Sequence, residues 1–424
     1  MLLTSELVRE AYQTPEIFSS SATIPTVPHP DWQWIPTMID PPLHGEYRRM
    51  MNIAFSPRFV RQIEDSVRQD CVEAIESFLD KGQCDFIEDF AKIYPTKVFL
   101  RIVGLPLEDT ELFMGWVETI FEGLGHFGDE AEDQLQAQRE IHKYFEGVLK
   151  DRRENPPANP EEDFFSIIAS SQINGRPITD EEFLNMSEVL LLAGLDTIKS
   201  QLSYIFYHLA ITPKDREWIV REPEIIPNAI EEFLRAHNIV MTARQVAQDT
   251  DFHGCPMKKG DMVMVANPSA SRDEAEYDNP TEIQFDRQVN RHYSFAGGPH
   301  RCAGAHLARR EMAIAIEEWH KRIPEYRVLN TDGLVESGPQ VGIESSSSVG
   351  TSENAMTKHV SIDTGKCSGH GRCYTLAPAF FDSDDEGFPV ILQTVVAEDA
   401  DGIADLIAAV DNCPERAITV TEQV

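Results

Sequence analysis

Basic residues are scarce in this sequence relative to acidic ones. Lys and Arg together number 37 and Asp and Glu 71, which gives a formal net charge of −34 at pH 7. A surface this acidic repels the phosphate backbone of nucleic acids, so we expect no nucleic-acid partner. The acidic excess extends to the end of the chain, because 4 basic and 12 acidic residues occur from Lys358 onward.

Cysteine is rare and its number is odd. Seven cysteines in 424 residues do not indicate a disulfide framework. Neither a signal peptide nor an apolar run long enough to span a bilayer is recognisable, so we expect a cytoplasmic protein without a membrane anchor. We expect no dinucleotide or flavin fingerprint of the Gly-x-Gly-x-x-Gly kind, so the chain itself is not expected to bind a nicotinamide or flavin.

One cysteine lies in a glycine-rich loop that leads directly into a helical pattern at residues 305–319. Cys302 precedes this helix start, and the positive end of the helix dipole favours a thiolate there. Gly298 and Gly304 allow backbone N–H groups to approach the sulfur, and Phe295 can shield it. This environment suits an axial thiolate ligand of haem iron. A buried cysteine without a ligand is the alternative, but it does not account for the glycines, the phenylalanine and the neighbouring basic residues together.

The run resembles the haem-binding loop of the cytochrome P-450 family, whose pattern is Phe-x-x-Gly-x-x-x-Cys-x-Gly. Phe295, Gly298, Cys302 and Gly304 match the pattern, and Ala296 stands where many members have glycine. The resemblance covers about residues 1–343 and is strongest to soluble bacterial members typified by the camphor hydroxylase. It implies haem b bound in a mainly α fold with small β-sheets.

An apolar helical segment at residues 181–209 contains Ala193, Gly194, Asp196 and Thr197. Glycine and β-branched threonine are poor helix formers, so a useful groove is one explanation for them and an ordinary core helix is the other. In the family this helix crosses above the haem, with Ala193 and Gly194 against it. The resemblance implies that the pair Asp196 and Thr197 delivers protons to the oxygen being activated.

Two further motifs resemble the family in the same order along the chain. His44 and Arg48 are four residues apart on one helical face, and cationic donors in that arrangement suit a carboxylate. The resemblance implies that they bind a haem propionate, together with Arg244 and His300. Glu232 and Arg235 form the structural Glu-x-x-Arg motif, whose later arginine partner is expected to be Arg287 or Arg291.

The resemblance also suggests where substrate and electron donor bind. Apolar residues at the matching positions imply a hydrophobic small molecule such as a terpenoid, alicyclic or aromatic compound. The expected lining residues are Trp32, Trp34, Val189, Leu192, Ala193, Val240 and Met241. A ferredoxin would need basic side chains on the thiolate side, for which the candidates are Arg48, Arg49, Arg58, Arg61, Arg309 and Arg310.

The start of the chain differs from the family pattern. Residues 5–18 resemble the family's second helix, so the first helix and first sheet strands have no counterpart. We therefore expect an N-terminally short haem domain at residues 1–343.

The last part of the sequence is a separate domain. Residues 344–357 are polar and serine-rich, typical of a flexible linker, and residues 358–424 follow it. Cys367, Cys373 and a distant Cys413-Pro resemble small α+β bacterial ferredoxins that serve cytochromes P-450, with His370 where a middle cysteine usually stands. Three thiolates suit a [3Fe-4S] cluster. A [4Fe-4S] cluster with His370 as fourth ligand, or a Cys₃His zinc site, are the alternatives.

A domain this small usually needs a metal or a disulfide, so unligated cysteines are not expected. The β-branched runs 360–362 and 418–420 are predicted to pair.

Together the motifs predict a haem-thiolate monooxygenase that uses O2 and receives electrons through its own iron–sulfur domain from an NAD(P)H-dependent ferredoxin reductase. A ferredoxin-fused sterol demethylase is one alternative, and a non-catalytic haem electron-transfer or sensor protein is the other.

Overall fold

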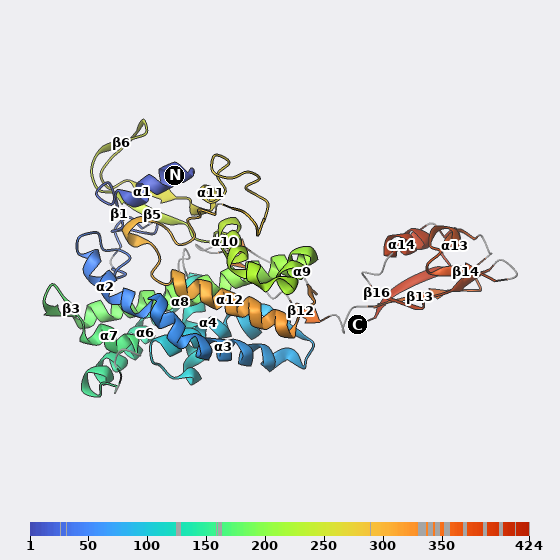
Figure 1. Cartoon of the computed structure of the whole chain (residues 1–424), viewed down its shortest axis with the longest axis horizontal. Coiled ribbons are helices and arrows are strands. Elements are labelled where there is room, and N and C mark those ends of the chain that lie inside the picture. The colour runs from blue at the N-terminus through green and yellow to red at the C-terminus, as the bar shows by residue number, and fades with distance from the viewer. Residues whose placement is uncertain are drawn as a thin grey trace. The chain divides into compact units, whose positions relative to one another are not determined.

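The computed structural model describes the 424-residue chain except residues 26, 31, 124–128, 158, 160–162, 289, 330–335, 338–341, 344–347, 352–356, 368–370, 385–387, 398–401, 412 and 424. Two compact units are present (Figure 1). Unit 1 comprises residues 1–324 and 328–349, and unit 2 comprises residues 325–327 and 350–424. The range predicted as a linker includes a short strand, β12 (Ser348–Thr351).

Unit 1 is mainly helical, as the family resemblance predicted. Its longest helix, α8, is capped at its start by Thr179 and Glu182, each of which bonds to the other's backbone. The helices are α1 (Ser5–Gln13), α2 (His44–Ala54), α3 (Pro57–Leu79), α4 (Ile93–Ile102), α5 (Thr110–Gly123), α6 (Asp129–Glu154), α7 (Phe164–Ser170), α8 (Asp180–Ile211), α9 (Pro213–Arg221), α10 (Ile226–Ala236), α11 (Asn267–Ala270) and α12 (Ala305–Arg322).

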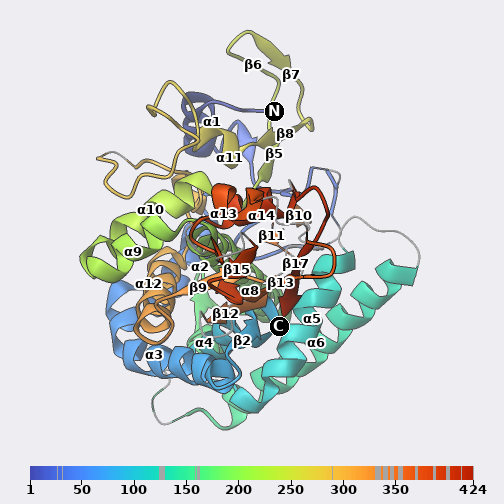
Figure 2. The same cartoon turned by 90° about the vertical axis from the view of Figure 1, so that its right-hand side faces the viewer.

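The helices pack around an aromatic core. Helix α3 lies along α12, and α5 lies beside α6 (Figures 1 and 2). The fully buried ring of Trp319 on α12 contacts Phe78, Phe90 and Phe206, with ring centroids 5.0 to 5.6 Å apart. Aromatic rings at these separations add stabilisation beyond the burial of their surface. The core therefore fixes α12, whose N-terminus follows Cys302.

Small sheets complete unit 1. Antiparallel strands β1 (Phe18–Ser19), β5 (Thr242–Val246) and β8 (Met262–Val265) form one sheet, and Leu2 adds a bridge to Val265. This sheet packs with α1 into an apolar cluster that brings the start of the chain against residues 242–265. The other strands that precede β12 in the sequence are β2 (Gln83–Asp85), β3 (Gln172–Ile173), β4 (Arg176–Pro177), β6 (Thr250–Phe252), β7 (Cys255–Met257), β9 (Tyr326–Val328), β10 (Glu336–Ser337) and β11 (Gly342–Ile343).

Two expectations about glycines and apolar runs need correction. The run from Gly123 to Gly128 does have the Gly-x-Gly-x-x-Gly spacing, but it begins at the last residue of helix α5 and not after a strand, so the dinucleotide-binding context is missing.

Helix α8 does reach the length and mean hydropathy of a membrane span, and 72% of its most apolar window is buried inside the protein. Its apolar character is therefore explained by its place in the core.

Unit 2 is a small α+β fold. Strand β13 (Thr357–Ile362) pairs antiparallel with β17 (Ile418–Gln423), with Val360 opposite Val420, which confirms the predicted pairing. Its core includes Cys373, Phe380 and Leu406. The other elements are α13 (Arg372–Leu376), β14 (Phe381–Ser383), β15 (Pro389–Ile391), β16 (Val395–Ala397) and α14 (Ile403–Asp411).

A buried carboxylate joins α6 to α8. Glu188 is 3% exposed and accepts hydrogen bonds from His142 at 2.6 Å and from Gln138 at 2.9 Å. The Glu188 carboxylate is the main cause that raises the pKa of His142 above its usual value. Because the pKa of His142 is higher in the folded state, its pair with Glu188 contributes its full stability below the unfolded-state pKa of about 6.5. This contribution is lost as the pH rises through the folded-state pKa.

We therefore expect His142→Gln to remove a stability contribution that exists at low pH, of roughly 1 kcal/mol, the usual size for a partly exposed pair. Urea unfolding followed by tryptophan fluorescence measures it in the full chain, because all five tryptophans lie within residues 1–324. The matched control is His253→Gln, which removes a more exposed pair with Glu10 and should change less. An equal loss above and below pH 7 would contradict the assignment.

Candidate functional site

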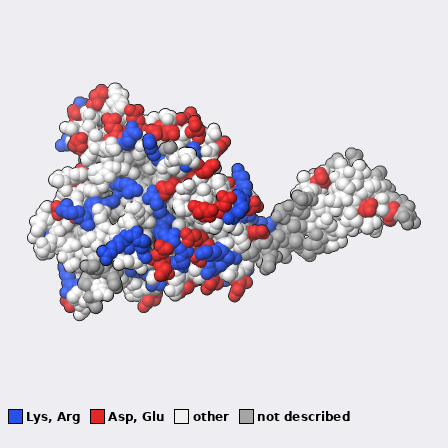
Figure 3. Space-filling model, in the orientation of Figure 1, with Lys and Arg blue, Asp and Glu red and all other residues white. Residues whose placement is uncertain are grey.

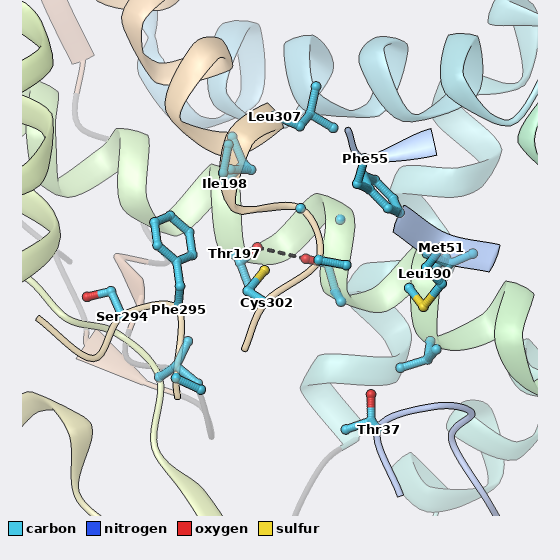
Figure 4. A pocket seen from close by; sticks show the side chains of 18 of the residues that line it. Thr37, Met51, Phe55, Leu190, Thr197, Ile198, Ser294, Phe295, Cys302 and Leu307 are labelled. Carbon is cyan, nitrogen blue, oxygen red and sulfur yellow. Dashed lines mark hydrogen bonds between the residues drawn. The ribbon is translucent and has the colours of Figure 1, made fainter. Parts of the chain in front are cut away.

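A cavity of about 340 Å³ lies within unit 1, where α2, α8 and α12 meet the loop that carries Cys302 (Figure 4). Met51 of α2, Phe55 directly after it, Leu190 and Thr197 of α8, and Cys302 all line it. Most of its remaining lining is apolar. This cavity gathers residues from four separate parts of the sequence, so it is the main candidate site.

The cysteine loop requires glycine at one position. Gly298 has φ +63°, and a Cβ atom there would lie 1.9 Å from the carbonyl oxygen of Tyr12. No other residue fits without moving that backbone. The Cys302 N–H donates to the carbonyl oxygen of Phe295 at 2.9 Å, which closes the loop. Ala296 has φ 53°, so the alanine occupies a left-handed conformation that glycine adopts more readily.

Cys302 lines the cavity and is exposed to it, although the protein around the cavity wall is dense. Burial raises the pKa of the Cys302 thiol, and the Gly304 N–H and three arginines, Arg48 among them, act in the opposite direction. Burial thus opposes the thiolate that the helix start favours. A metal ion deprotonates a coordinating thiol outright and supplies what the loop lacks.

Four basic side chains converge beside the cysteine loop. The rings of His44 and His300 lie 4.2 Å apart, and Arg48 lines the cavity with them, whereas Arg244 is buried just behind. Burial is the main cause that lowers the pKa of His300 to about 3, and His44, Arg244 and Arg48 lower it further. The His300 Nε2 atom is buried without a hydrogen-bond partner in the described structure. Such a cluster, with Asp40 as its nearby carboxylate, is suited to an anionic ligand.

The predicted proton-delivery pair does not share one cavity. Thr197 lines the cavity with Ala193 and Gly194, and its hydroxyl donates to the Ala193 carbonyl at 2.7 Å. Asp196 is 6% exposed and pairs with Lys199 at 2.6 Å. It lines a second, much smaller cavity together with Lys92, Thr96, Met114, Val117, Glu118, Leu195 and Lys199.

The Glu-x-x-Arg motif is fully buried. Arg235 donates two hydrogen bonds to Glu232, at 2.7 and 2.8 Å. Arg287 donates to the same carboxylate at 3.1 Å, which identifies it, and not Arg291, as the later arginine. These contacts hold α10 against the irregular segment that precedes the cysteine loop.

Family models match both units of the chain. Residues 1–319 match the model of "Cytochrome P450" and residues 360–420 match that of "4Fe-4S single cluster domain". The chain belongs to the cytochrome P450 family. It is a monooxygenase that uses haem and incorporates oxygen, and it carries an iron–sulfur domain at its C-terminus.

Curated relatives align with most of unit 1. "Probable cytochrome P450 127A1" of Sinorhizobium fredii is 34% identical over 335 residues, 78% of each chain. "Steroid C26-monooxygenase" of Mycolicibacterium smegmatis is 30% identical over 77% of this chain and 80% of the relative. "Cytochrome P450-terp" of Pseudomonas sp is 32% identical over 66% and 68%. The crystal structure of CYP101J2 superposes with a TM-score of 0.74 at 32% identity, over 82% of this chain and 86% of that one.

The residues around the cavity fit a haem. Cys302 lines it, and the basic cluster of His44, Arg48, Arg244 and His300, with the buried and unpartnered Nε2 of His300, suits the propionates of a haem. Phe295 is held beside the loop, with the guanidinium of Arg309 4.5 Å above its ring.

Several predicted substrate residues lie elsewhere. Trp32, Trp34 and Leu192 are absent from the cavity lining, and Met241 is 40% exposed. Val189, Ala193 and Val240 do line it. The structure adds further lining residues that the sequence motifs did not indicate: Pro36, Thr37, Gln201, Ile239 and Glu311.

In unit 2, Cys367 and Cys413 each lie within electrostatic reach of Cys373, but the three described cysteines are not close enough together to form a metal site. The charges of Cys367 and Cys413 both act on the pKa of Cys373. The backbone N–H of Ala417 donates to the Cys413 sulfur at 3.3 Å, as amides do to cluster sulfurs. No set of three His, Cys, Asp or Glu side chains is close enough to hold a metal among the described residues, and His370 lies outside them.

Proposed function

We propose that this cytochrome P450 inserts one oxygen atom of O2 into a small hydrophobic substrate and receives its electrons through its own C-terminal iron–sulfur domain. The observation that carries the proposal is that Cys302, the basic cluster and Thr197 meet at one largely apolar cavity. Cys302 would ligate the haem iron. A haem with a thiolate ligand supplies the one-electron and O–O cleavage chemistry of oxygen insertion.

The protein's own residues orient the cofactor and keep water away. His44, Arg48, Arg244 and His300 would bind the propionates, while Phe295, Gly298 and Gly304 shape the thiolate side and Ala193 and Gly194 the opposite side. A Cβ atom at Gly194 would lie 3.4 Å from the Phe99 ring, so a side chain at this position would contact that ring.

The substrate class follows from the lining. Val189, Ile239 and Val240 are apolar, and Thr37 adds one hydroxyl (Figure 4). Such a lining suits a terpenoid, alicyclic or aromatic compound. Because relatives named as a steroid C26-monooxygenase and as P450-terp are similarly close in sequence, a sterol is the second candidate. A spectral screen of the haem Soret band against monoterpenes and sterols tests both. A response to neither class would contradict the proposed substrate class.

We propose that Asp196 and Thr197 deliver protons from two sides of α8. Thr197→Ala should continue to consume NADH but release more of the reduced oxygen as hydrogen peroxide, because the hydroxyl that directs protonation is lost. Asp196→Asn should slow turnover by about 100-fold, since the path loses its ionisable member. Measuring NADH, peroxide and product together separates these effects. Normal rate and coupling in both variants would leave the two residues with a structural role only.

We propose that unit 2 holds a [3Fe-4S] cluster on Cys367, Cys373 and Cys413. A three-iron cluster is paramagnetic when oxidised, so the oxidised protein should give an electron paramagnetic resonance signal from the cluster. The matched control is Cys255→Ser, since Cys255 is exposed in unit 1 and should not affect the signal. A silent oxidised protein with four irons would favour [4Fe-4S] with His370 as a ligand. Zinc in place of iron would exclude electron transfer by this domain.

An NAD(P)H-dependent ferredoxin reductase is the proposed external donor. Figure 3 shows basic side chains on the face that carries α2, α3 and α12, interleaved with acidic ones. The acidic partners are identifiable: Arg309 pairs with Glu231 and Arg310 with Glu64. Arg58 and Arg61 are exposed and have no ion pair in the part of the chain the structure describes. These two are the best candidates for contact with an acidic redox protein.

A further inference from the structure

The aromatic residue of the cysteine loop is held by a cation from α12. Phe295 is buried, and the Arg309 guanidinium lies 4.5 Å from the centroid of its ring. A cation over an aromatic face is attracted by the electron density of the ring, and more strongly where water is excluded. The carbonyl oxygen of Phe295 accepts the Cys302 N–H at 2.9 Å. The position of Arg309 is therefore connected to that of the cysteine through a single residue.

A carboxylate from α10 fixes this arginine. Glu231 accepts two hydrogen bonds from Arg309, one from Nε to Oε1 and one from Nη2 to Oε2 at 2.8 Å. The Nη1 atom of Arg309 also donates to the carbonyl oxygen of Ala305 at 3.2 Å. Two parallel bonds to one carboxylate fix both the plane and the direction of a guanidinium. Glu231 therefore keeps Arg309 over the ring of Phe295.

A histidine that precedes the loop also binds this carboxylate. The ring centroids of His292 and Phe295 are 5.9 Å apart, and the Nε2 atom of His292 lies 3.2 Å from Oε2 of Glu231. The Ser294 N–H donates to Nδ1 of His292 at 3.3 Å, so Nδ1 is an acceptor and Nε2 carries the hydrogen that Glu231 accepts. Burial raises the pKa of Glu231, but Arg309 and His292 lower it, and the pKa is about 2. Glu231 is therefore ionised.

The two charges of this pair act in opposite directions on the cysteine. Burial is the main cause that raises the pKa of the Cys302 thiol, and the charge of Arg309 is among the causes that lower it. A cation near a thiolate draws electron density from the sulfur, and an ionised carboxylate beside that cation offsets the effect. The electron density on the sulfur therefore depends on the balance between Arg309 and Glu231.

We propose that Glu231 is a positioning residue for electron transfer, which holds Arg309 over Phe295 so that the charge balance of this pair sets the reduction potential of a haem ligated by Cys302. The proposal rests on the proposed function, in which one electron from the iron–sulfur domain converts ferric haem to ferrous haem. The ferrous form carries one more negative charge than the ferric form. An unbalanced cation on the thiolate side therefore favours the ferrous form, and an unbalanced carboxylate favours the ferric form.

A redox titration of the full chain, followed by the haem Soret band, tests this without turnover. Glu231→Gln keeps the side-chain shape and should raise the reduction potential, because the charge of Arg309 is no longer balanced. Arg309→Gln should lower it, because Glu231 then remains without its cation. Each change should shift the ferrous-to-ferric ratio at a fixed potential by at least about threefold, which is roughly 30 mV for a one-electron couple. The double variant restores the balance and should return close to the value of the unmodified protein.

Two further variants separate this effect from a general loss of structure. Glu64→Gln is the matched control, since it removes a carboxylate from the pair that Glu64 forms with Arg310, the next residue of α12. It should leave the potential unchanged. Arg309→Lys keeps the charge but not the two parallel bonds. Its potential should lie closer to that of the unmodified protein than the potential of Arg309→Gln does. Its low-spin ferric electron paramagnetic resonance lines should broaden, because Phe295 is no longer held in one position.

The sign of the shifts decides the outcome. Shifts of Glu231→Gln and Arg309→Gln in the same direction, or shifts no larger than that of Glu64→Gln, would overturn the proposal. If one of the two variants does not retain haem, the sign of the other against Glu64→Gln still decides. The proposed function fails in a different way, through the absence of the thiolate carbon monoxide spectrum in the unmodified protein.

Discussion

Replacing Cys302 by histidine should move the Soret band of the reduced carbon monoxide complex from the strongly red-shifted position of thiolate haem to that of a histidine-ligated globin. The reason is that Cys302 is the only cysteine in the cavity lining. Product formation should fall by at least about 100-fold, because thiolate ligation is what favours O–O cleavage. Absorbance spectra and product assays on the same preparation check both.

The variant should nevertheless retain haem. His44, Arg48, Arg244 and His300 are untouched by the substitution, and these donors should still bind the propionates. Cys255→Ser is the matched control, because Cys255 is exposed on β7 and should leave band and activity unchanged. A red-shifted band that persists in Cys302→His would mean that another residue ligates the iron.

The sequence predicted best where the backbone itself is constrained. Gly298 was predicted from its place in the cysteine loop, and the structure shows why: a side chain there would collide with the backbone of Tyr12. The β13 and β17 pairing was likewise predictable, because β-branched residues on both runs favour strands. In both places the requirement is local, so a short run of residues is enough to show it.

Side-chain direction was harder to predict. Asp196 and Thr197 are adjacent on a helix of 3.6 residues per turn, so their side chains point about 100° apart and reach different cavities. The motif therefore identifies both residues, but it does not show that their side chains lie on two sides of α8. Trp32 and Trp34 were expected in the cavity, but they lie in a segment without helix or strand, whose path no periodicity fixes.

The pairing of the buried glutamates Glu311 and Glu318 on α12 could be predicted from the sequence only in part. Oε2 of Glu311 makes no hydrogen bond in the described structure, whereas cations bind the carboxylate of Glu318. Glu318 has Lys321 and Arg322 three and four residues further along the same helix, whereas Glu311 has no cation at those positions. Arg68, on a distant helix, is the part of the difference that only the structure shows. Such differences depend on tertiary packing and therefore require the structure.

Deleting residues 358–424 should leave the haem spectrum intact and abolish NADH-driven turnover with reductase alone. The carboxyl-terminal domain has its own core, so its loss should leave unit 1 folded. Tethering should give it an effective concentration on the order of millimolar, so at micromolar protein the loss should be at least about 100-fold. An excess of free ferredoxin should restore turnover. Cys373→Ser in the full chain is the companion variant, since it removes a proposed cluster ligand but keeps the tether. Undiminished turnover of the shortened protein with reductase alone would show that this domain is not the electron donor.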